Sequence, residues 1–220
     1  MSNSYHKQSY LDEFLNLKSC GDILNIVSPI GSAQKEISES MGIIKLIKPI
    51  TLKKPMHYTL YDFCAGNSLT SIISVFLLPI KNAIAIDRKQ RTRKWEMAKR
   101  FEYKFVDIYD FDISKIDRNS IVCGVHPCKE LAERIIWIFN QSQAQYLFLM
   151  PCCNGKIKKI LPTAINDKIN KPMRWCYELY TQIETDDKNI IQDKKILSPR
   201  NLIIIARKQN IIRISDEIIL

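Results

Sequence analysis

The sequence lacks any long hydrophobic run, and this absence sets the first limit on what the protein can be. No apolar stretch among its 220 residues approaches the roughly 20 residues needed to span a bilayer. The segment from Met1 to Lys18 is polar and amphipathic, without the uninterrupted apolar core of a secretory signal. We therefore expect a cytoplasmic protein that has no membrane partner.

Internal repeats, low-complexity segments and C-x-x-C pairs are absent as well. The remaining composition, 46% hydrophobic and 25% charged, is ordinary for a globular chain. A chain of 220 residues can bury enough surface to fold without disulfides or metals. Its seven cysteines should be reduced in a cytoplasmic setting, so they are core residues, ligands or reactive groups before they are disulfides.

Glycine is scarce, with six residues in the chain, and the scarcity bears on the kind of ligand. The segment Asp62-Phe63-Cys64-Ala65-Gly66-Asn67-Ser68 lies between an expected strand and an expected helix but holds one glycine, so the G-x-G-x-x-G fingerprint is missing. Ala65 and Gly66 still let the backbone approach a ligand, and the helix N-terminus adds N–H donors. A small adenosyl ligand is favoured over the pyrophosphate of a nicotinamide dehydrogenase.

Short apolar runs alternate with helical patterns from Tyr58 onward, which predicts a doubly wound, mostly parallel α/β sheet of seven strands. The first five strands are expected at residues 59–64, 83–87, 103–107, 121–125 and 146–150. Helices between them are expected at 69–78, 91–101 and 128–141, and a further helix at 171–183. A turn at 198–201 then separates two strands that should pair antiparallel at one sheet edge, and residues 211–220 form a last strand or a tail.

The first 54 residues are expected to form a helical extension in front of a domain over residues 55–220. A helix is predicted from Ala33 to about Ile47, with Ser32 as N-cap and Glu36 near the position of a capping-box partner. Pro49 should lie beyond the end of this helix. Helices placed before the first strand often roof the ligand in such folds, which is an analogy at the level of the fold.

Acidic residues lie at or near the ends of the first three expected strands: Asp62, Asp87 and Asp107. Asp87 lies 21 positions after Gly66, the spacing at which an acid binds ribose hydroxyls in this kind of fold. Asp107 could accept a hydrogen bond from an adenine amino group while the Ile108 backbone meets the ring edge. Each acid alone is common turn chemistry, but three in register with a glycine loop predict an adenosyl site.

These segments resemble class I S-adenosylmethionine-dependent methyltransferases, since residues 62–68 look like their motif I and residues 83–89 like their second strand with its ribose-binding acid. Two later segments, Gly124-Val125-His126-Pro127-Cys128 and Met150-Pro151-Cys152-Cys153, resemble one branch of that class. In this branch a His-x-Cys segment ends strand four and a Pro-Cys-Cys segment ends strand five. The branch includes methyltransferase-like proteins of unassigned substrate and is similar to the tRNA ribose 2′-O-methyltransferases of the acceptor stem.

The resemblance implies S-adenosylmethionine as the methyl donor and a set of cofactor contacts. The implied contacts are Asp62, Cys64, Ala65, Gly66, Asn67, Asp87, Arg88, Asp107, Ile108 and Val125. The chain departs from the pattern at Cys64-Ala65-Gly66, where the family has Gly-x-Gly, and at Val125, where it has Leu. An Asn-Pro-Pro-Tyr segment is absent, which argues against the enzymes that methylate exocyclic amines of bases.

The catalytic candidates are His126, Cys128, Cys152 and Asn154, because strands four and five should end next to strand one. His126 could act as a general base, and a cysteine could attack a pyrimidine ring. Zinc bound by His126, Cys128, Cys152 and Cys153 is a third possibility. Adjacent cysteines rarely ligate one ion together, so we expect no metal, and buried packing beneath the cofactor remains the alternative for the thiols.

A net charge of +10, from 33 Lys and Arg against 23 Asp and Glu, favours a polyanionic partner. The candidates for nucleic-acid contact are Arg91, Arg93, Lys94, Lys156, Lys158 and Lys159. An ordinary solvated helix face would also explain the first three. The sequence thus predicts methyl transfer to RNA, with tRNA as the favoured class. Methylation of a protein or small molecule, and an RNA-binding protein that keeps the fold without catalysis, are the alternatives.

Overall fold

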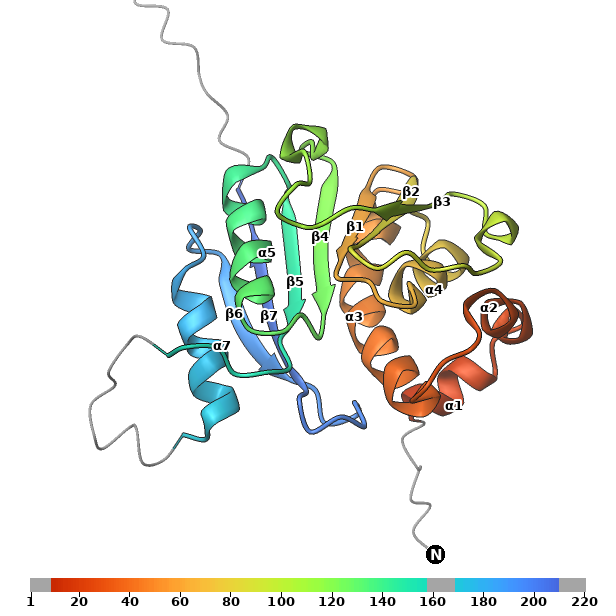
Figure 1. Ribbon diagram of the computed structural model, residues 1–220, viewed down its shortest axis with the longest axis horizontal. Coiled ribbons are helices and arrows are strands. Elements are labelled where there is room, and N and C mark those ends of the chain that lie inside the picture. The colour runs from red at the N-terminus through yellow and green to blue at the C-terminus, as the bar shows by residue number, and fades with distance from the viewer. Residues whose placement is uncertain (1–8, 158–168, 210–220) are drawn as a thin grey trace, which may run out of the picture.

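The computed structural model describes residues 9–157 and 169–209. Within them a central seven-stranded sheet has helices on both faces (Figure 1). The strands are β1 (Thr59–Phe63), β2 (Asn82–Asp87), β3 (Phe101–Phe105), β4 (Ser120–Val125), β5 (Tyr146–Met150), β6 (Lys188–Gln192) and β7 (Leu202–Arg207). Their order is β3-β2-β1-β4-β5-β7-β6, and β7 runs in the direction opposite to the other six. The predicted fold class is confirmed.

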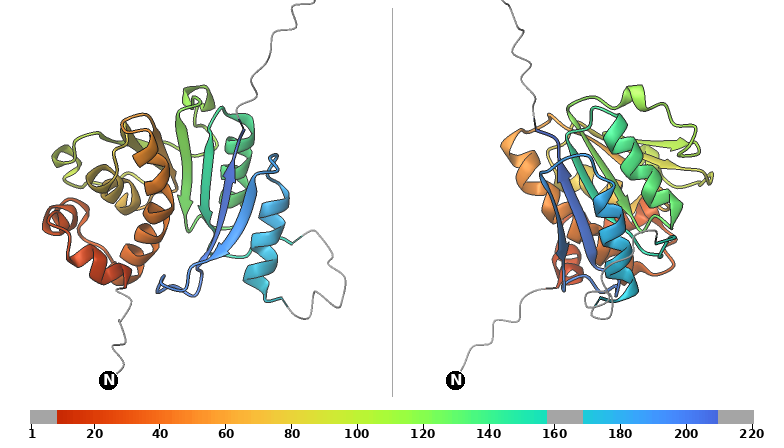
Figure 2. Two further views of the ribbon diagram at one scale, coloured as in Figure 1. Left: turned by 180° about the vertical axis from the view of Figure 1, so that it is seen from behind. Right: turned by 90° about the vertical axis from the view of Figure 1, so that its left-hand side faces the viewer.

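Two apolar layers cover the sheet (Figure 2). One face carries the helices α1 (Tyr10–Leu15), α2 (Cys20–Val27), α3 (Ala33–Lys53) and α4 (Leu69–Leu77), and the other carries α5 (Glu130–Gln141) and α7 (Lys171–Thr181). Leu60 packs into the first layer and its neighbour Tyr61 into the second, as strand alternation requires. Because both faces are buried, the central strands read as continuous apolar runs. No helix of the described ranges is both long and apolar enough to cross a bilayer.

The parallel strands bring their carboxyl ends to one edge of the sheet. Strand β1 pairs with β2 on one side and β4 on the other, and β4 pairs with β5 so that Val125 lies opposite Met150. From β1 the chain proceeds outward through β2 and β3, whereas from β4 it proceeds outward the other way to β5. This reversal is the point at which open α/β sheets bind their ligands.

The helix predicted at residues 91–101 is wrong. The structure has one short turn of 3₁₀ helix there, η1 (Trp95–Met97), and β3 begins already at Phe101, two residues before the predicted start. The apolar spacing that suggested a helix face serves local packing instead, because Trp95 stacks on Tyr103 at a ring distance of 3.9 Å. Strand β3 is an edge strand of mixed exposure, so a continuous apolar run did not mark its ends.

Helix α3 also differs from its prediction, since it continues through Pro49 to Lys53. Ile47 and Thr51 are fully buried on either side of that proline, and their packing maintains the helix across the lost backbone hydrogen bond. The side chain of Ser32 makes no capping bond, so the predicted capping box is absent at α3. A capping box occurs instead at α1, between Ser9 and Asp12.

The predicted antiparallel pair at the sheet edge is confirmed as β6 and β7. The later strand, β7, inserts between β5 and β6, so β6 forms the edge. Residues 211–220, predicted as a last strand or tail, lie outside the described residues. The division between an extension over residues 1–54 and a domain over 55–220 stays a prediction.

Candidate functional site

The loop that follows β1 (residues 64–68, the β1 loop) is folded over the end of β2. Cys64, Gly66 and Ser68 all have left-handed backbones, with φ of 59°, 54° and 59°. Glycine adopts this region freely, but for the other two it is strained, and such strain collects at binding sites. The Gly66 N–H donates to Oδ2 of Asp87 at 2.8 Å, and the Ala65 N–H to the Ile86 carbonyl at 3.1 Å.

A first cavity of about 190 Å³ opens between the β1 loop and the ends of β2 and β3. Its walls include five of the predicted cofactor contacts: Cys64, Asp87, Arg88, Asp107 and Ile108. The acids here are held by backbone groups, since Oδ1 of Asp87 accepts from the Lys89 N–H at 2.9 Å and Oδ1 of Asp107 from the Tyr109 N–H at 3.0 Å. Both carboxylates therefore have fixed positions in the wall.

A second cavity of about 330 Å³ adjoins the first, and Cys64 and Arg91 line both. Four more predicted cofactor contacts line it: Ala65, Gly66, Asn67 and Val125. The opposite wall comes from α3 and the start of α4, with Lys35, Glu36, Glu39, Ser40 and Thr70. None of these five was predicted from sequence to contact a ligand, and Arg91 was predicted to contact nucleic acid and not the cofactor. The available signal for the five was a polar stretch on the helix before the first strand.

Asp62 is the exception among the predicted cofactor contacts, because it lines neither cavity. Its side chain points from β1 toward α4 and is 1% exposed. Oδ2 accepts from the Ser71 hydroxyl at 2.8 Å, and Oδ1 from the Cys123 thiol at 3.5 Å. Burial raises the pKa of Asp62 to about 6, although these hydrogen bonds act in the opposite direction. Asp62 thus holds β1 to α4 and β4 beneath the β1 loop.

His126 lies at the far end of the second cavity, directly after β4. Its N–H donates to the Met150 carbonyl at 2.8 Å, and its backbone has a φ of 60°. Nε2 of the imidazole lies 2.9 Å from Oε1 of Glu39, and Nζ of Lys35 lies 3.7 Å from the same oxygen. The Glu39 side chain is 5% exposed and that of His126 17%, so a buried carboxylate faces a partly buried imidazole between α3 and the end of β4.

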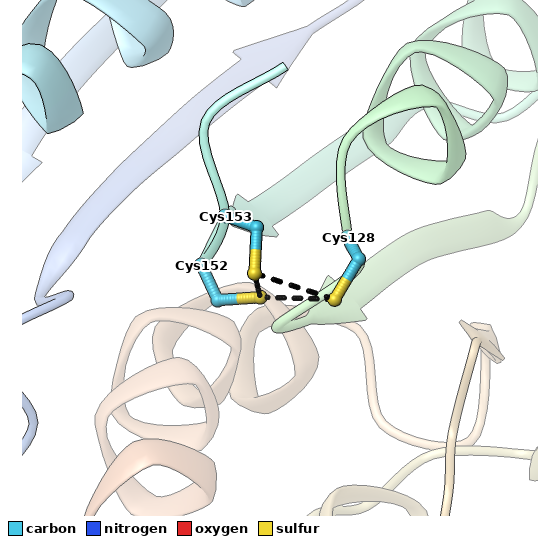
Figure 3. Close-up of side chains that lie close together, drawn as sticks. All are labelled: Cys128, Cys152 and Cys153. Carbon is cyan, nitrogen blue, oxygen red and sulfur yellow. Dashed lines mark hydrogen bonds between the residues drawn. The ribbon is translucent and has the colours of Figure 1, made fainter.

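Three thiols lie together beside His126: Cys128, Cys152 and Cys153 (the thiol cluster, Figure 3). Sγ of Cys152 lies 3.4 Å from Sγ of both other cysteines, and those two are 3.6 Å apart. Burial raises the pKa of Cys128 and Cys152, whereas hydrogen bonds from the other two thiols lower the pKa of Cys153. The strands thus bring together two predicted catalytic residues, Cys128 and Cys152, and add Cys153.

Cys64 has a different environment from the thiol cluster. Burial, together with the nearby Asp87 carboxylate, raises the pKa of the Cys64 thiol to about 12. Its side chain forms part of both cavity walls. Asn154, the fourth catalytic candidate, lies in the loop after β5 with Oδ1 buried and without a hydrogen-bond partner among the described residues.

The predicted nucleic-acid contacts divide into inward and outward side chains. Arg91 and Arg93 both donate to Oδ1 of Asn67, at 3.3 and 3.2 Å, and Nε of Arg93 also donates to the Val27 carbonyl at 3.1 Å. These two arginines hold the β1 loop through Asn67. The prediction placed them on a helix face directed to solvent. Nζ of Lys94 donates to Asn25, and Lys156 is exposed. Lys158 and Lys159 lie outside the described residues.

Comparison with known proteins identifies the family. The model of a family described as "Methyltransferase domain" matches residues 33–160, more than half of the chain. A comparison with curated proteins finds no match. Among solved structures, the ribosomal protein L11 methylase from Lactobacillus delbrueckii subsp. bulgaricus is 14% identical, with 82% of each chain covered and a TM-score of 0.50, which is a likeness of fold.

Two further solved structures have lower TM-scores. Protein 1320 of Thermoplasma acidophilum is 12% identical, covers 86% of this chain and 97% of its own, and has a TM-score of 0.49. TrmK of M. capricolum, in complex with S-adenosyl-homocysteine, is 12% identical, covers 78% and 67%, and has a TM-score of 0.45. From the matched family model, the chain belongs to the methyltransferase-domain family and is an S-adenosylmethionine-dependent methyltransferase.

Proposed function

We propose that the two adjoining cavities bind S-adenosylmethionine and that the protein transfers its methyl group to RNA. In the first cavity Asp87 binds the ribose hydroxyls, Asp107 accepts from the adenine amino group, and Ile108 lies against the ring. A Cβ built on Gly66 meets no atom within 4 Å, so the space above the β1 loop is free for a ligand. The methionine part then extends into the second cavity, where Glu36 is the carboxylate available to its ammonium group.

The methyl acceptor enters from the β4 side of the second cavity in this arrangement. His126 lines that side, and Glu39 fixes its imidazole ring. The donor supplies an activated methyl group, so the protein contributes mainly by holding the acceptor atom in line with it. We infer that His126 binds the acceptor group through a hydrogen bond and thereby positions it.

The observation that carries the choice of RNA is the set of cations around both cavities. Lys35, Arg88, Lys89 and Arg91 line them, and the exposed Lys156 follows the loop after β5. One of these cations can bind the single α-carboxylate of the donor, but the donor offers no other anionic group for the rest. Phosphates reward such clusters. The His-x-Cys and Pro-Cys-Cys segments, which resemble those of tRNA ribose 2′-O-methyltransferases, support the same choice.

The test combines binding and transfer. Calorimetric titration with S-adenosylmethionine and S-adenosylhomocysteine should give saturable binding of both. Donor labelled in the methyl group should then label RNA, and the label should be released by ribonuclease. Labelled protein or labelled small molecules with unlabelled RNA would replace this proposal by its alternative. His126→Ala should lower turnover at least about tenfold, by losing a positioned hydrogen bond, while donor affinity stays unchanged.

The cationic contact is tested separately. Lys156→Ala should weaken RNA binding and lower the slope of log affinity against log salt by about one. Lys53→Ala is the matched control, because Lys53 is exposed at the end of α3 beside the opposite edge of the sheet. Equal slopes for the two variants would contradict a role in RNA binding for the loop after β5 (residues 151–157, the β5 loop).

A further inference from the structure

We propose that Cys128, Cys152 and Cys153 bind one Zn²⁺ ion through their three thiolates, leaving a fourth position open to solvent. The three Sγ atoms lie within 4.8 Å of one another. Two of the thiols are exposed and the third is half-buried. None of the three cysteines lines either cavity. The proposal therefore does not depend on which molecule the cavities bind.

The pairing of β4 with β5 creates the cluster. The ladder extends one residue beyond β4 through the bond from the His126 N–H to the carbonyl of Met150, the last residue of β5. Cys128 and Cys152 therefore each follow a fixed point by two residues. The thiol of Cys152 donates to the His126 carbonyl at 3.2 Å, which joins the two loops directly.

Adjacent cysteines in an extended strand point to opposite sides, which is the reason to doubt a shared ion. Here the chain has left β5 and bends at Cys153. Figure 3 shows the Cys152 and Cys153 side chains turned toward the same point, opposite Cys128. The objection drawn from sequence therefore does not apply to this loop.

The sulfur spacing suits a tetrahedral ion. Thiolates bound to zinc at ~2.3 Å with tetrahedral angles lie about 3.8 Å apart. The observed separations of 3.4, 3.6 and 3.4 Å need a small opening to reach that value. Exposed side chains in a loop can make this change without moving the core.

The donor set indicates the kind of metal. All three ligands are sulfur, which selects zinc and softer ions over magnesium or calcium. The His126 Nε2 is directed to Glu39 instead, so among the described residues the group holds three protein ligands. Three ligands with an open fourth position are the arrangement of zinc sites that bind water or a substrate group. Lys129 and Arg200 lie near Cys153 and offset the negative charge of three thiolates.

The loop that carries two of the ligands is fixed from behind. Gly155 lies so close to the buried Trp175 ring that a Cβ on it would be 2.5 Å from Cζ2. Trp175 is 1% exposed and belongs to α7, which packs on the sheet. This contact holds the β5 loop in one place without using a polar group of the cluster.

The experiment uses the full chain, reduced and freed of metal. Zn²⁺ is titrated against a chromophoric chelator, and Co²⁺ is added in parallel because thiolate coordination gives intense charge-transfer absorption. We expect one ion per chain and thiolate–cobalt absorption. Cys128→Ser and Cys153→Ser should each weaken binding by at least about a hundredfold, because loss of an outer-shell partner alone costs up to that much.

The matched control is Cys20→Ser, since Cys20 is a partly exposed thiol on α2 away from the cluster. It should bind zinc like the unchanged protein. Absence of binding at one ion per chain would overturn the proposal, as would binding that survives Cys153→Ser. A disulfide within the cluster that persists in reductant, detected by alkylating the thiols, would also overturn it. Calorimetry with S-adenosylmethionine on the same variants separates this result from failure of donor binding.

Discussion

At the β1–β3 half of the sheet's carboxyl edge, carboxylates are held in place by backbone N–H groups. At the β4–β5 half, the polar groups are held mainly by other side chains and by carbonyls. Asp87 and Asp107 illustrate the first arrangement, and His126 with the thiol cluster illustrates the second. The bonds that hold the carboxylates of the first half lie within its own strands and loops, whereas the second half depends on the loops after β4 and β5 staying in register.

The difference assigns different tasks to the two halves. A preformed wall of fixed charges suits a ligand that is the same in every reaction cycle. A cluster of exposed thiols beside an imidazole suits groups that change coordination or partner. Variants that damage one half and spare the other can therefore test whether the two are independent.

The largest effect is expected for Asp87→Ala. Hydrogen bonds to a charged group are worth ~1.5–3 kcal/mol each, and the variant would lose two to the ribose in addition to the bond from Gly66. Calorimetry should show donor affinity lowered at least about a hundredfold. Zinc binding should be unchanged. An affinity within a factor of about two of the original would remove Asp87 from the ribose site.

A smaller effect is expected for Gly155→Ala, which acts on the other half. The added Cβ collides with the buried Trp175 ring, and overpacking of this kind costs ~1–3 kcal/mol. Chemical denaturation should show the loss, and the thiol cluster should bind metal less tightly while donor affinity is retained.

Gly21→Ala is the matched control for this change. A Cβ on Gly21 meets no atom within 4 Å, and the residue lies inside α2. Alanine there should leave stability unchanged or raise it by up to ~1 kcal/mol. Equal losses in both glycine variants would show that the Trp175 contact does not fix the loop.

The smallest expected effect is on the pH dependence of stability and concerns Asp62, which is buried between β1, α4 and β4. Its folded-state pKa, raised to about 6 by burial from 3.8, means that the folded protein binds this proton more tightly than the unfolded chain. The resulting stabilisation is full below the unfolded pKa and is lost as pH rises through about 6. Between pH 5 and 7 the wild type should lose about 1 kcal/mol more than Asp62→Asn. Parallel denaturation curves for both proteins at each pH would contradict this.

Much of the β1–β3 half could be predicted from sequence because its signals are local. Ala83 to Ile86 is a continuous apolar run since both faces of β2 are buried, and Asp87 follows where the run stops. Strand β3 ends at Phe105, two residues before the predicted end at Asp107, because that strand lies at the edge and is partly exposed, so no continuous apolar run marks its bounds. Asp62 was grouped with the other acids because spacing along the chain does not reveal which way a strand residue points.

The β4–β5 half depends on contacts that no local pattern encodes. The role of Glu39 depends on where α3 crosses the sheet, and that position follows from packing between distant apolar residues. The convergence of His126 with two cysteines was foreseen from strand order. The shared direction of Cys152 and Cys153 was not, because it results from a bend after β5. Arg91 donates to Asn67 and Arg93 to the Val27 carbonyl. The predicted helix would have placed both side chains in solvent, and no local pattern indicates these acceptors.

The position of β7 has a consequence for the order in which the enzyme is made. Strands β1 to β3 pair with one another or with β4, so most of the wall of the first cavity can assemble once residues up to about 125 have left the ribosome. Strand β5 has one edge that stays unpaired until residues 202–207 emerge and insert as β7. Its central residues are buried almost completely in the folded protein, so this edge is exposed to aggregation until residues 202–207 have been synthesised. A ribosome-bound chain can therefore form the carboxylate wall with Asp87 and Asp107 well before β5 gains its second neighbour.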